Sequence, residues 1–204
     1  DSNLDDIFKD YRFDFVNHQA ARGDVRASVE KPKEYVDVNI IGGINLLESC
    51  VRYKLKGFIY SSTGGCVYGE PQYYPTDESH PMRPIDPYGS SKAGFELYLP
   101  IFKRLYNLQY TIFRYPNVYG PRQNPFGEAG VVSIFSQRML KKKDVIINGS
   151  GLQERDYVYI ADVVNANIMA IEKMNNTVYN LGSGIGTSVN EIFSCLTTLI
   201  DYSK

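Results

Sequence analysis

The stretches GFIYSS (57–62), YGSSKAGFELYLPIFKRLYN (88–107) and YTIFRYP (110–116) decide the fold of this chain. The first and third are short runs rich in β-branched and aromatic residues, which is typical of buried strands. The middle segment repeats its apolar residues at helical spacing, so it predicts a helix despite Pro100. A strand, a helix and a strand in this order form a unit whose two strands lie parallel, because parallel strands need a crossover connection.

The same alternation continues on both sides of this unit. Residues 13–20 predict a strand and residues 34–54 a helix, after a first segment (1–12) that has the pattern of a helix end. Toward the C-terminus the pattern predicts, in chain order, a helix, a short strand, a helix, a strand and a last helix: 131–142, 144–149, 163–174, 177–182 and 189–201. We therefore expect an α/β fold whose parallel sheet is covered by helices on both faces.

The composition argues against several kinds of partner. A chain of 204 residues with 43% hydrophobic and 22% charged residues is long enough for one packed domain, or for one domain with a small lobe. Its formal net charge of -1 gives no attraction to nucleic acid or to an anionic membrane, and we expect the basic run Lys141–Lys143 to be a solvated helix end. Two histidines and three widely spaced cysteines do not suit a metal site. We expect no metal, no nucleic acid and no membrane partner.

The cysteines and the first residues of the chain indicate a cytoplasmic protein. Cys50, Cys66 and Cys195 are odd in number and far apart, which suits a reducing compartment better than a disulfide framework. No stretch approaches the ~20 apolar residues of a membrane span. The polar, acidic start DSNLDDIFKD (1–10) is unlike a signal peptide.

Several polar side chains fall at one edge of the expected sheet. Thr63 follows one strand, and residues 115–117 end the next strand along the chain. Tyr88 and Lys92 open the helix between these strands. Ligands of parallel sheets bind beyond the carboxyl ends of the strands, where all of these residues are expected. Positions i and i+4 share a helix face, so Lys92 would lie one turn below Tyr88 with its ammonium near the phenol.

A tyrosine beside a lysine has a chemical use. The pKa of a free tyrosine is about 10, so a tyrosine that acts as a base near neutral pH needs a shift of roughly 3 units, or about 4 kcal/mol. A neighbouring ammonium and a bound cationic nicotinamide both favour the phenolate. The spacing alone is no more than chance gives with 17 tyrosines in 204 residues, and a surface lysine on an amphipathic helix is the alternative.

Four longer strings carry a resemblance to a known family. They are SSTGGCVYGEP (61–71), PYGSSKAGFELY (87–98), FRYPNVYGPRQ (113–123) and RDYVYIADVVNANIMAIE (155–172). In this order and spacing they closely resemble the extended short-chain dehydrogenases/reductases, a family of NAD-dependent epimerases and dehydratases, and in particular its nucleotide-sugar 4-epimerases. The resemblance runs over nearly the whole chain. It implies a Rossmann-like sheet with a small C-terminal substrate-binding part, NAD as cofactor, a UDP-sugar as substrate and a homodimer.

The resemblance assigns the catalytic roles to three residues. Tyr88 matches the catalytic base, and Lys92 matches the residue that binds the nicotinamide ribose and lowers the tyrosine pKa. Thr63 matches the hydroxyl residue that completes the triad. Ser62 could substitute for Thr63 in this alignment, and an ordinary turn at the strand end is a further alternative for both hydroxyls. We expect Thr63.

The resemblance also implies binding contacts. The residues expected at the cofactor are Ala20, Ala21, Asn39, Ser61, Tyr88, Lys92, Tyr115 and Pro116. The residues expected at the substrate are Thr63, Asn117, Val132, Asn148 and Arg155.

Roles within these sets differ. Asn117 and Arg155 resemble contacts to the substrate diphosphate, and the planar fork of an arginine suits phosphate. Val132 and Asn148 match positions near the nucleotide base. The alternative for the two alanines is tight packing, the alternative for Asn39 is a polar position on a helix, and the alternative for Arg155 is an ion pair with Asp156.

The family's glycine-rich turn is not found where the resemblance places it. The family opens with a G-x-x-G-x-x-G turn that holds the cofactor pyrophosphate, and nothing before Asp1 supplies it. The similar string LGSGIGTS (181–188) is not followed by a strand that ends in an acidic residue, so we expect it to serve packing. The chain is thus expected to be the middle of an epimerase that lacks the first strands and the C-terminal substrate residues, and to bind NAD poorly by itself. We expect residues 1–129 to form part of the NAD-binding domain, and residues 130–204 to be mainly substrate-binding, with segments that return to the core domain.

Two glycines indicate which reaction of the family to expect. Family members share the removal of the sugar 4-hydroxyl proton while hydride passes to NAD, which gives a 4-keto sugar. Dehydratases then use an Asp-Glu pair, and decarboxylases a glutamate, directly after the catalytic threonine, where this chain has Gly64 and Gly65. Without a carboxylate there, return of the hydride to the opposite face of the ketone gives epimerisation. A dehydratase or decarboxylase, a nonenzymatic dinucleotide sensor and an inert structural fragment remain as alternatives.

Overall fold

The computed structural model of the protein describes residues 2–126 and 130–202. By its packing the chain divides into two compact units. Unit 1 consists of Asp1–Tyr115 and Asn165–Leu181, and unit 2 consists of Pro116–Val164 and Gly182–Lys204. The functional division after residue 129 that we expect from the sequence is a different kind of boundary and stays a prediction.

Unit 1 is built on a parallel sheet of four strands. They are β1 (Phe15–His18), β2 (Gly57–Thr63), β3 (Gln109–Tyr115) and β6 (Thr177–Asn180). Their order in the sheet is β1-β2-β3-β6, and each neighbouring pair is parallel. The strands predicted around these four ranges are therefore confirmed. The register pairs Ser62 with Arg114 and Thr63 with Tyr115, so the two hydroxyl residues that end β2 point to opposite sides of the sheet.

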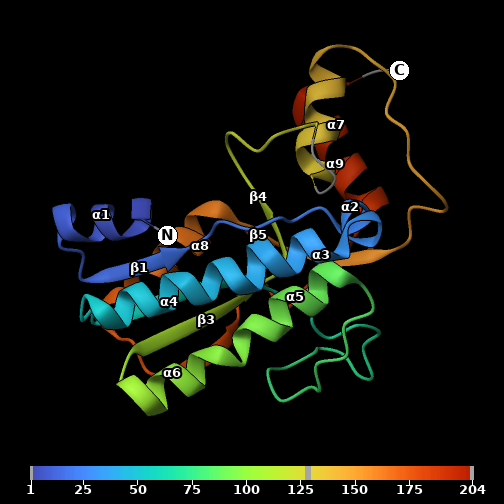
Figure 1. Ribbon diagram of the computed structural model, residues 1–204. Helices are drawn as coiled ribbons and strands as arrows, with labels where there is room; N and C mark the ends of the chain where they lie inside the picture. The colour runs from blue at the N-terminus through green and yellow to red at the C-terminus, as the bar shows by residue number, and fades with distance from the viewer. Residues whose placement is uncertain (1, 127–129, 203–204) are drawn as a thin grey trace. The chain divides into compact units, whose positions relative to one another are not determined.

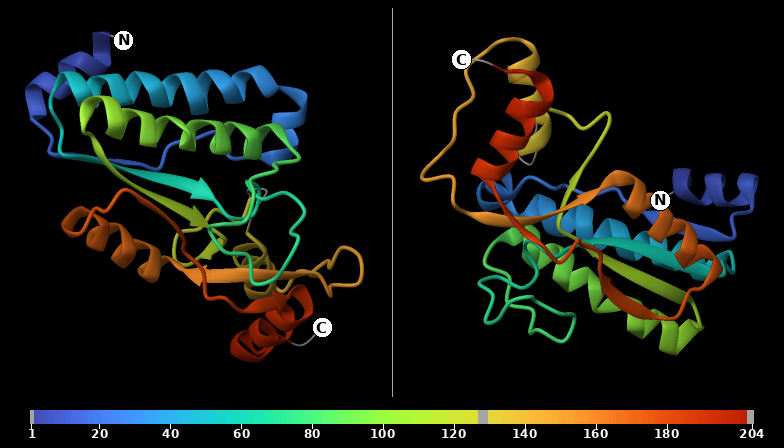
Figure 2. Two further views of the ribbon diagram at one scale, coloured as in Figure 1. Left: turned by 90° about the horizontal axis from the view of Figure 1, so that it is seen from below. Right: turned by 180° about the vertical axis from the view of Figure 1, so that it is seen from behind.

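Helices cover both faces of this sheet (Figure 1). The helical segments of unit 1 are α1 (Ser2–Tyr11), α2 (Val25–Glu30), α3 (Pro32–Tyr35), the π-helical η1 (Val36–Ile41), α4 (Gly42–Arg52), α5 (Pro87–Glu96) and α6 (Tyr98–Tyr106). A further helix, α8 (Ile160–Glu172), enters unit 1 at Asn165. Figure 2 shows α4, α5 and α6 along one face of the sheet and α8 against the other, which confirms the α/β architecture. Within the described ranges, none of the helices combines the length and the apolar character that crossing a membrane requires.

Each face of the sheet has its own core. On the side of α4, α5 and α6 the buried apolar cluster consists of Phe8, Leu47, Cys50, Leu55, Phe58, Tyr60, Phe95, Leu99, Phe102, Leu108, Tyr110 and Ile112. On the side of α8, Ile59 and Phe113 pack with Ala170. Residues 58, 59 and 60 alternate between the two clusters, because successive side chains of a strand point to opposite faces. Full burial of such an apolar side chain contributes about 1.5–3 kcal/mol.

Two predicted helices are present but interrupted. The helix predicted at 88–107 is divided between α5 and α6, because Pro100 has no N–H to donate to the Glu96 carbonyl and its ring crowds that carbonyl. The helix predicted at 34–54 contains the π-helical η1, which places Asn39 in the interior with 2% of its surface exposed.

Unit 2 has a small mixed sheet and a pair of helices. The strands are β4 (Asn117–Tyr119), β5 (Glu154–Tyr159) and β7 (Gly186–Ser188), in the order β4-β5-β7. β4 and β5 are parallel, whereas β5 and β7 are antiparallel. The helices α7 (Val131–Leu140) and α9 (Val189–Ile200) confirm the two predicted there and pack through Phe135 and Phe193, whose ring centroids are 6.2 Å apart.

One predicted strand is wrong. Residues 144–149 form no strand in the described part of the chain, and most of their side chains are exposed. An isolated extended segment has no partner for its backbone N–H and C=O groups, so an apolar pattern alone does not make it a strand. The same reasoning explains why the short strands β4, β5 and β7 were not predicted: their pairing partners, rather than their own sequence, define them.

Candidate functional site

Thr63 and Tyr88 meet at the carboxyl end of β2. Thr63 is the last residue of this strand, and Tyr88 is the second residue of α5. The helix begins here because Pro87 occupies its first position and the Asp86 carboxylate accepts the Gly89 N–H at 2.7 Å. The side chains of Thr63 and Tyr88 share a hydrogen bond. The fold thus brings these two predicted residues together.

The Tyr88 phenol is held in its neutral form. Burial raises its pKa to about 12, the charge of Cys66 adds to the rise, and the hydrogen bond with Thr63 opposes it. We expected Lys92 to lower this pKa, but burial dominates, and Lys92 is not among the groups with the largest effect on the phenol. Burial thus sets the pKa of the phenol here, and a lowering of this pKa by Lys92 stays a prediction.

Lys92 lies one helical turn after Tyr88 and is 3% exposed. Its ammonium lies over an aromatic ring, with Nζ 4.3 Å from the ring centroid of Tyr60. Burial lowers the pKa of Lys92 to about 8, and the charge of Glu96 opposes this. Burial, helped by the charge of Lys92, also lowers the pKa of His18 to about 4. Lys92 is therefore a cation in poorly solvating surroundings.

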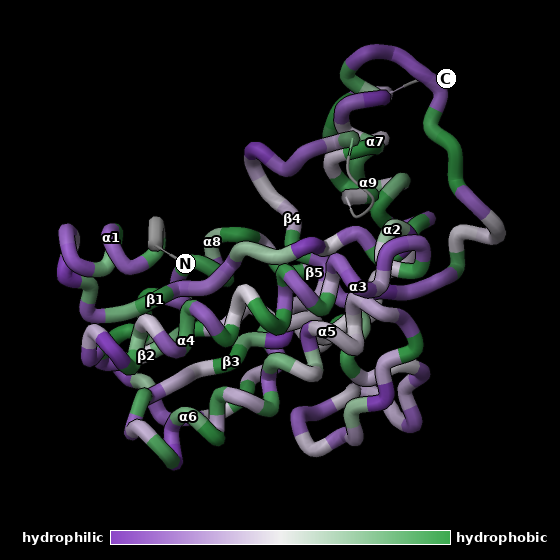
Figure 3. Tube along the Cα trace, in the orientation of Figure 1, coloured by the Kyte–Doolittle hydropathy of each residue, from purple (hydrophilic) through white to green (hydrophobic). Residues whose placement is uncertain are grey.

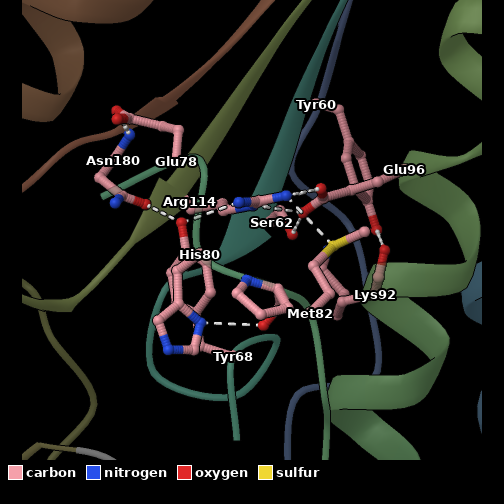
Figure 4. Close-up of polar contacts among 11 residues, drawn as sticks. Tyr60, Ser62, Tyr68, Glu78, His80, Met82, Lys92, Glu96, Arg114 and Asn180 are labelled. Carbon is pink, nitrogen blue, oxygen red and sulfur yellow. Dashed lines mark hydrogen bonds and ion pairs between the residues drawn. The ribbon is translucent and has the colours of Figure 1, made fainter. Parts of the chain in front are cut away.

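Glu96 belongs to a second buried polar group, shown in Figure 4. It forms an ion pair with Arg114, with 2.7 Å between Nη2 and Oε2, and it also accepts a hydrogen bond from Ser62. Arg114 donates to the Tyr68 hydroxyl at 2.8 Å, and this hydroxyl donates to Oδ1 of Asn180 at 2.7 Å. The group thereby ties α5, β3 and the end of β6 to the loop that follows β2.

The two hydroxyl residues that end β2 have different partners. Ser62 donates to Glu96 on the helix-covered face, whereas Thr63 contacts the Tyr88 phenol. Of the two residues that the sequence offers for the triad, the geometry gives the contact with the phenol to Thr63.

Asn39 holds the backbone that follows β1. Its Oδ1 accepts the Arg22 N–H at 2.8 Å, and its Nδ2 donates to the Arg22 carbonyl at 3.0 Å and to Oγ of Ser91 at 2.8 Å. Ala20 and Ala21 directly precede Arg22 and are exposed. The polar atoms of Asn39 thus fasten this segment to α5. A contact of Asn39 or of the alanines with a cofactor stays a prediction.

Tyr115 ends β3 on the side of the sheet that α8 covers. Its hydroxyl accepts from Nδ2 of Asn167 at 2.8 Å and from Nε2 of Gln19 at 3.4 Å. Burial raises the pKa of Tyr115, and these two hydrogen bonds oppose the rise. Ser61 lies half-buried in β2, two residues before Thr63. Cofactor contacts of Tyr115 and Ser61 stay predictions.

Apart from Thr63, the predicted substrate residues belong to unit 2. Asn117 opens β4, and its Nδ2 donates to the Asp156 carbonyl at 3.2 Å. Arg155 lies on the neighbouring β5 with an exposed side chain, whose Nη1 donates to the Glu154 carbonyl at 2.7 Å. A guanidinium with this exposure keeps donors for a ligand.

The remaining predicted residues of unit 2 come from separate segments. Pro116 separates β3 from β4, Val132 lies in the first turn of α7, and Asn148 lies in the exposed segment before β5. Their roles stay predictions.

Asp156 binds the glycine-rich string that resembles a phosphate-binding turn. Its carboxylate accepts from the Ser183 N–H at 2.9 Å, from Oγ of Ser183 at 2.7 Å and from the Gly184 N–H at 2.8 Å. A Cβ on Gly182 would lie 2.3 Å from Oδ2 of Asp156, so the turn needs a glycine there. The N–H groups that a phosphate would use are therefore given to a carboxylate, which supports the packing role expected for 181–188. The Asp156 carboxylate is hydrogen-bonded to Ser183 and Gly184, so the described residues do not support the alternative in which it forms an ion pair with Arg155.

Sequence reasoning missed Tyr60, Glu96, Arg114 and His18 as neighbours of the site. A signal existed for Glu96, which follows Lys92 by four positions and therefore shares its helix face. A signal also existed for Arg114, because a charged residue inside a buried strand requires a partner. Finding Tyr60 and His18 needs the register of β1 and β2.

The residues of unit 1 fit the nicotinamide riboside part of a dinucleotide. The Lys92 ammonium and the Tyr88 hydroxyl are donors that suit ribose hydroxyls, and both lie beside the carboxyl end of a parallel strand, where such ligands bind. The poorly solvated charge of Lys92 gains from polar ligand atoms. A metal site is a different matter: the part of the chain that the structure describes has no group of three or more His, Cys, Asp or Glu that could hold a metal ion.

Comparison with known proteins establishes the family. Residues 1–182 match the model of the NAD-dependent epimerase/dehydratase family. The chain belongs to this family. The resemblance seen in the sequence is thereby confirmed.

The most informative relatives are UDP-glucose 4-epimerases. A crystal structure of the enzyme from Thermotoga maritima with UDP-glucose matches this chain with a TM-score of 0.96 at 48% identity. The match covers 100% of this chain and 66% of the Thermotoga maritima chain. The structure of the enzyme from Thermus thermophilus in complex with NAD matches with a TM-score of 0.92 at 40% identity. This match covers 99% of this chain and 67% of the Thermus thermophilus chain. The UDP-glucose 4-epimerase of Mycolicibacterium smegmatis is 36% identical over 197 residues, which is 96% of this chain and 63% of the relative. The chain thus spans about two thirds of the length of these proteins.

Proposed function

We propose that this protein is a nucleotide-sugar 4-epimerase that interconverts UDP-glucose and UDP-galactose with NAD as cofactor. The observation that carries the proposal is the arrangement at the carboxyl end of β2, where Thr63 is hydrogen-bonded to Tyr88 and the Lys92 ammonium is buried one helical turn away. A phenol with a hydroxyl partner and a nearby cation is suited to take a proton from a sugar hydroxyl and to return it.

In this proposal each of the three residues has its own task. Tyr88 takes the proton of the sugar 4-hydroxyl and gives it back, and Thr63 orients the phenol by the hydrogen bond they share. The pKa of Tyr88, about 12, has to fall for this task, and positive charge next to the phenol lowers it. Lys92 supplies a fixed positive charge and binds the cofactor ribose. NAD, when bound, supplies reversible hydride transfer at the sugar C4.

The remaining contacts are proposed on the family pattern. The residues proposed to hold NAD together with Tyr88 and Lys92 are Ala20, Ala21, Asn39, Ser61, Tyr115 and Pro116. The residues proposed to hold the nucleotide part of the substrate are Asn117, Val132, Asn148 and Arg155. The exposed guanidinium of Arg155 supports its place at the diphosphate, because arginine forms bidentate hydrogen bonds with phosphate.

The two glycines after Thr63 favour epimerisation over dehydration or decarboxylation. A Cβ built on Gly65 would lie 3.8 Å from Oγ1 of Thr63, so a side chain at this position would stand beside the proposed catalytic hydroxyl. A carboxylate there could move a second proton, and this chain has none at either Gly64 or Gly65. The 4-keto sugar is then left with return of the hydride as its simplest fate.

We also propose that the protein is a cytoplasmic homodimer. Exposed apolar side chains recur on η1, at the start of α6 and along α6: Val36, Val38, Ile41, Leu97, Ile101, Leu105 and Tyr106. Figure 3 shows hydrophobic residues along both α4 and α6. Exposed apolar side chains of this kind on η1 and α6 suit a second copy of the same chain. The free thiols of Cys50, Cys66 and Cys195 suit a reducing compartment.

The test uses protein produced from the complete gene. It is incubated with NAD and with UDP-glucose, UDP-galactose, their N-acetylated forms or UDP-glucuronate, and the products are identified by ¹H NMR. We expect the 4-epimer of UDP-glucose and no net reduction of NAD. A 6-deoxy-4-keto product would instead identify a dehydratase, release of carbon dioxide a decarboxylase, and NAD binding without turnover of any sugar a sensor. Sedimentation equilibrium tests the dimer, for which a monomer at all concentrations is the contrary result.

A further inference from the structure

Tyr60 touches Lys92 twice. The ammonium of Lys92 lies 4.3 Å from the centroid of the Tyr60 ring, within the ~6 Å reach of a cation–π interaction. The Tyr60 hydroxyl donates to the backbone carbonyl of the same lysine at 3.5 Å, as Figure 4 shows. Both residues are buried, Tyr60 to 1% exposure and Lys92 to 3%. The contact is therefore sheltered from water, where an aromatic ring stabilises a cation most.

The ring of Tyr60 is itself held in place. The ring of Phe95 lies 4.7 Å away between centroids, and the ring of His18 lies 5.9 Å away and nearly parallel. These residues come from α5 and β1, on two sides of β2. The ring face that meets the ammonium is thus fixed by the core and does not depend on a ligand.

The Glu96 carboxylate, one helical turn after Lys92, is already engaged. Glu96 accepts from Nε and Nη2 of Arg114, at 3.2 Å and 2.7 Å, and from the hydroxyl of Ser62. A carboxylate that satisfies a guanidinium has little left for an ammonium one turn away. The charge of Glu96 still favours the protonated lysine, and the face of the Tyr60 ring lies directly against the ammonium.

Titratable groups on the other elements around Lys92 leave its charge in place. His18 on β1 is neutral near pH 7, because burial and then the charge of Lys92 lower its pKa to about 4. Burial raises the pKa of Tyr60 on β2, with Glu96 and Tyr88 adding to the rise, so this phenol is also neutral. The guanidinium of Arg114 on β3 is ion-paired with the Glu96 carboxylate.

We propose that Tyr60 is a positioning residue: the face of its ring holds the protonated ammonium of Lys92 at the place from which it reaches the cofactor ribose and the proposed base Tyr88. The inference rests on the proposed function for the task of Lys92. The placement of the ammonium by the ring stands on the geometry of unit 1 alone.

The experiment compares three variants of the protein from the complete gene. Tyr60→Phe keeps the ring and loses the hydroxyl, and Tyr60→Leu removes the ring. Phe58→Leu is the matched control, because Phe58 lies two residues earlier on the same face of β2, is fully buried at 0% exposure, and packs on the same Phe95. The first readout is NMR of protein labelled with ¹³C-lysine, in which the Hε and Cε signals of Lys92 are assigned by their loss in Lys92→Met. The second readout is the pH dependence of kcat/KM with UDP-glucose.

The two readouts have distinct expected results. The Hε protons of Lys92 are shielded by the ring current in the unchanged protein, in Tyr60→Phe and in Phe58→Leu. In Tyr60→Leu the shielding disappears, the titration midpoint of Lys92 falls by about one pH unit, and kcat/KM at pH 7 falls about tenfold. Phe58→Leu loses thermal stability as Tyr60→Leu does but keeps the midpoint and the pH profile. Unshielded Hε protons in the unchanged protein, or an unchanged midpoint in Tyr60→Leu, would overturn the proposal.

A second series covers the case in which Tyr60→Leu does not fold. Phenylalanine analogues with an increasing number of fluorine atoms at position 60 keep the shape of the ring and withdraw electron density from its face. We expect the titration midpoint of Lys92 to fall steadily with fluorination, and a constant midpoint would refute the role of the ring. A protein that turns over no UDP-sugar but shows shielded Lys92 protons would refute the proposed function and leave the placement of the ammonium standing.

Discussion

Two buried cations of unit 1, Arg114 and Lys92, have opposite surroundings. Arg114 is paired with Glu96 and donates to Tyr68. Burial lowers its pKa, but the hydrogen bonds and charges of Glu96 and Tyr68 together outweigh burial, so the pKa is raised. Lys92 has an aromatic ring under its ammonium, and burial lowers its pKa to about 8. The first cation is satisfied within the fold. The second is left with a charge that a ligand can use.

The difference shows which of the two buried cations receives the buried carboxylate. Glu96 follows Lys92 on the same helix face, and yet its carboxylate belongs to Arg114 on β3. A buried pair with matched donors and acceptors costs little to keep and much to break. An unmatched buried charge costs free energy of folding, which is tolerated where it serves chemistry.

The largest effect is expected for Tyr88→Phe, which removes the phenol that takes and returns the sugar proton in the proposed reaction. We expect kcat to fall by about 10²–10⁴-fold, the range that a positioned acid or base contributes. NAD binding and the melting temperature should change little, because the ring is kept. UDP-glucose turnover, NAD titration and thermal unfolding provide the measurements.

Tyr35→Phe is the matched control for this prediction. Tyr35 is a buried tyrosine whose ring faces that of Tyr88 at 6.4 Å between centroids, but its hydroxyl donates to the Asp24 carbonyl. Its loss should leave kcat within about threefold and remove the hydrogen bond to the Asp24 carbonyl, worth about 1 kcal/mol. Equal loss of activity in both variants would show that Tyr88 has no special role.

The next largest effect is expected when the buried ion pair of Arg114 and Glu96 is broken. Arg114→Met leaves the buried Glu96 carboxylate without its cation, so we expect the free energy of unfolding to fall by about 3–5 kcal/mol. In the double variant Arg114→Met/Glu96→Leu both charges of the pair are removed together, and we expect most of this loss to be recovered. Urea denaturation measures both variants. If single and double variants are equally unstable, the pair is not what stabilises this region.

The sequence predicts the sheet of unit 1 better than it predicts unit 2. Each of the four parallel strands carries its own apolar run, so local pattern is enough to find them. β4 and β7 have three residues each and are defined by their pairing with β5. For the same reason the apolar residues of 144–149 predicted a strand that does not form: the pattern was present and the partner was not.

The same distinction holds for the candidate site, where some features follow from local sequence and others need the tertiary structure. Thr63, Tyr88 and Lys92 could be placed at one edge from strand order alone, because the carboxyl ends of parallel strands share an edge. What could not be predicted is the balance of charges, which depends on register and burial. The pairing of Ser62 with Arg114 across β2 and β3 places both side chains beside Glu96, which pairs with Arg114. Burial, which the sequence does not show, raises the pKa of Tyr88.

The smallest effect is expected for the pH dependence of stability that Lys92 brings. Its pKa is about 8 in the folded protein, below the 10.5 of an ordinary lysine. Below pH 8 Lys92 is protonated in both the folded and the unfolded state, so the folded state bears the full free-energy penalty of the buried charge. Above pH ~10.5 Lys92 is neutral in both states, and this penalty is absent. Between these limits the unfolded state binds more protons, so stability rises with pH.

Lys92→Met removes this penalty, because methionine fills a similar volume without a charge. We expect the variant to exceed the unchanged protein in free energy of unfolding by up to about 3 kcal/mol at pH 7, and the difference to shrink toward zero by pH ~10.5. Urea unfolding of both proteins at a series of pH values measures the difference directly and cancels the other titrating groups. Arg114→Met, in which a satisfied cation is removed, should show the opposite sign at pH 7. A Lys92→Met protein that is less stable at pH 7 would mean that the ammonium is as well satisfied as the guanidinium, and the contrast between the two cations would fail.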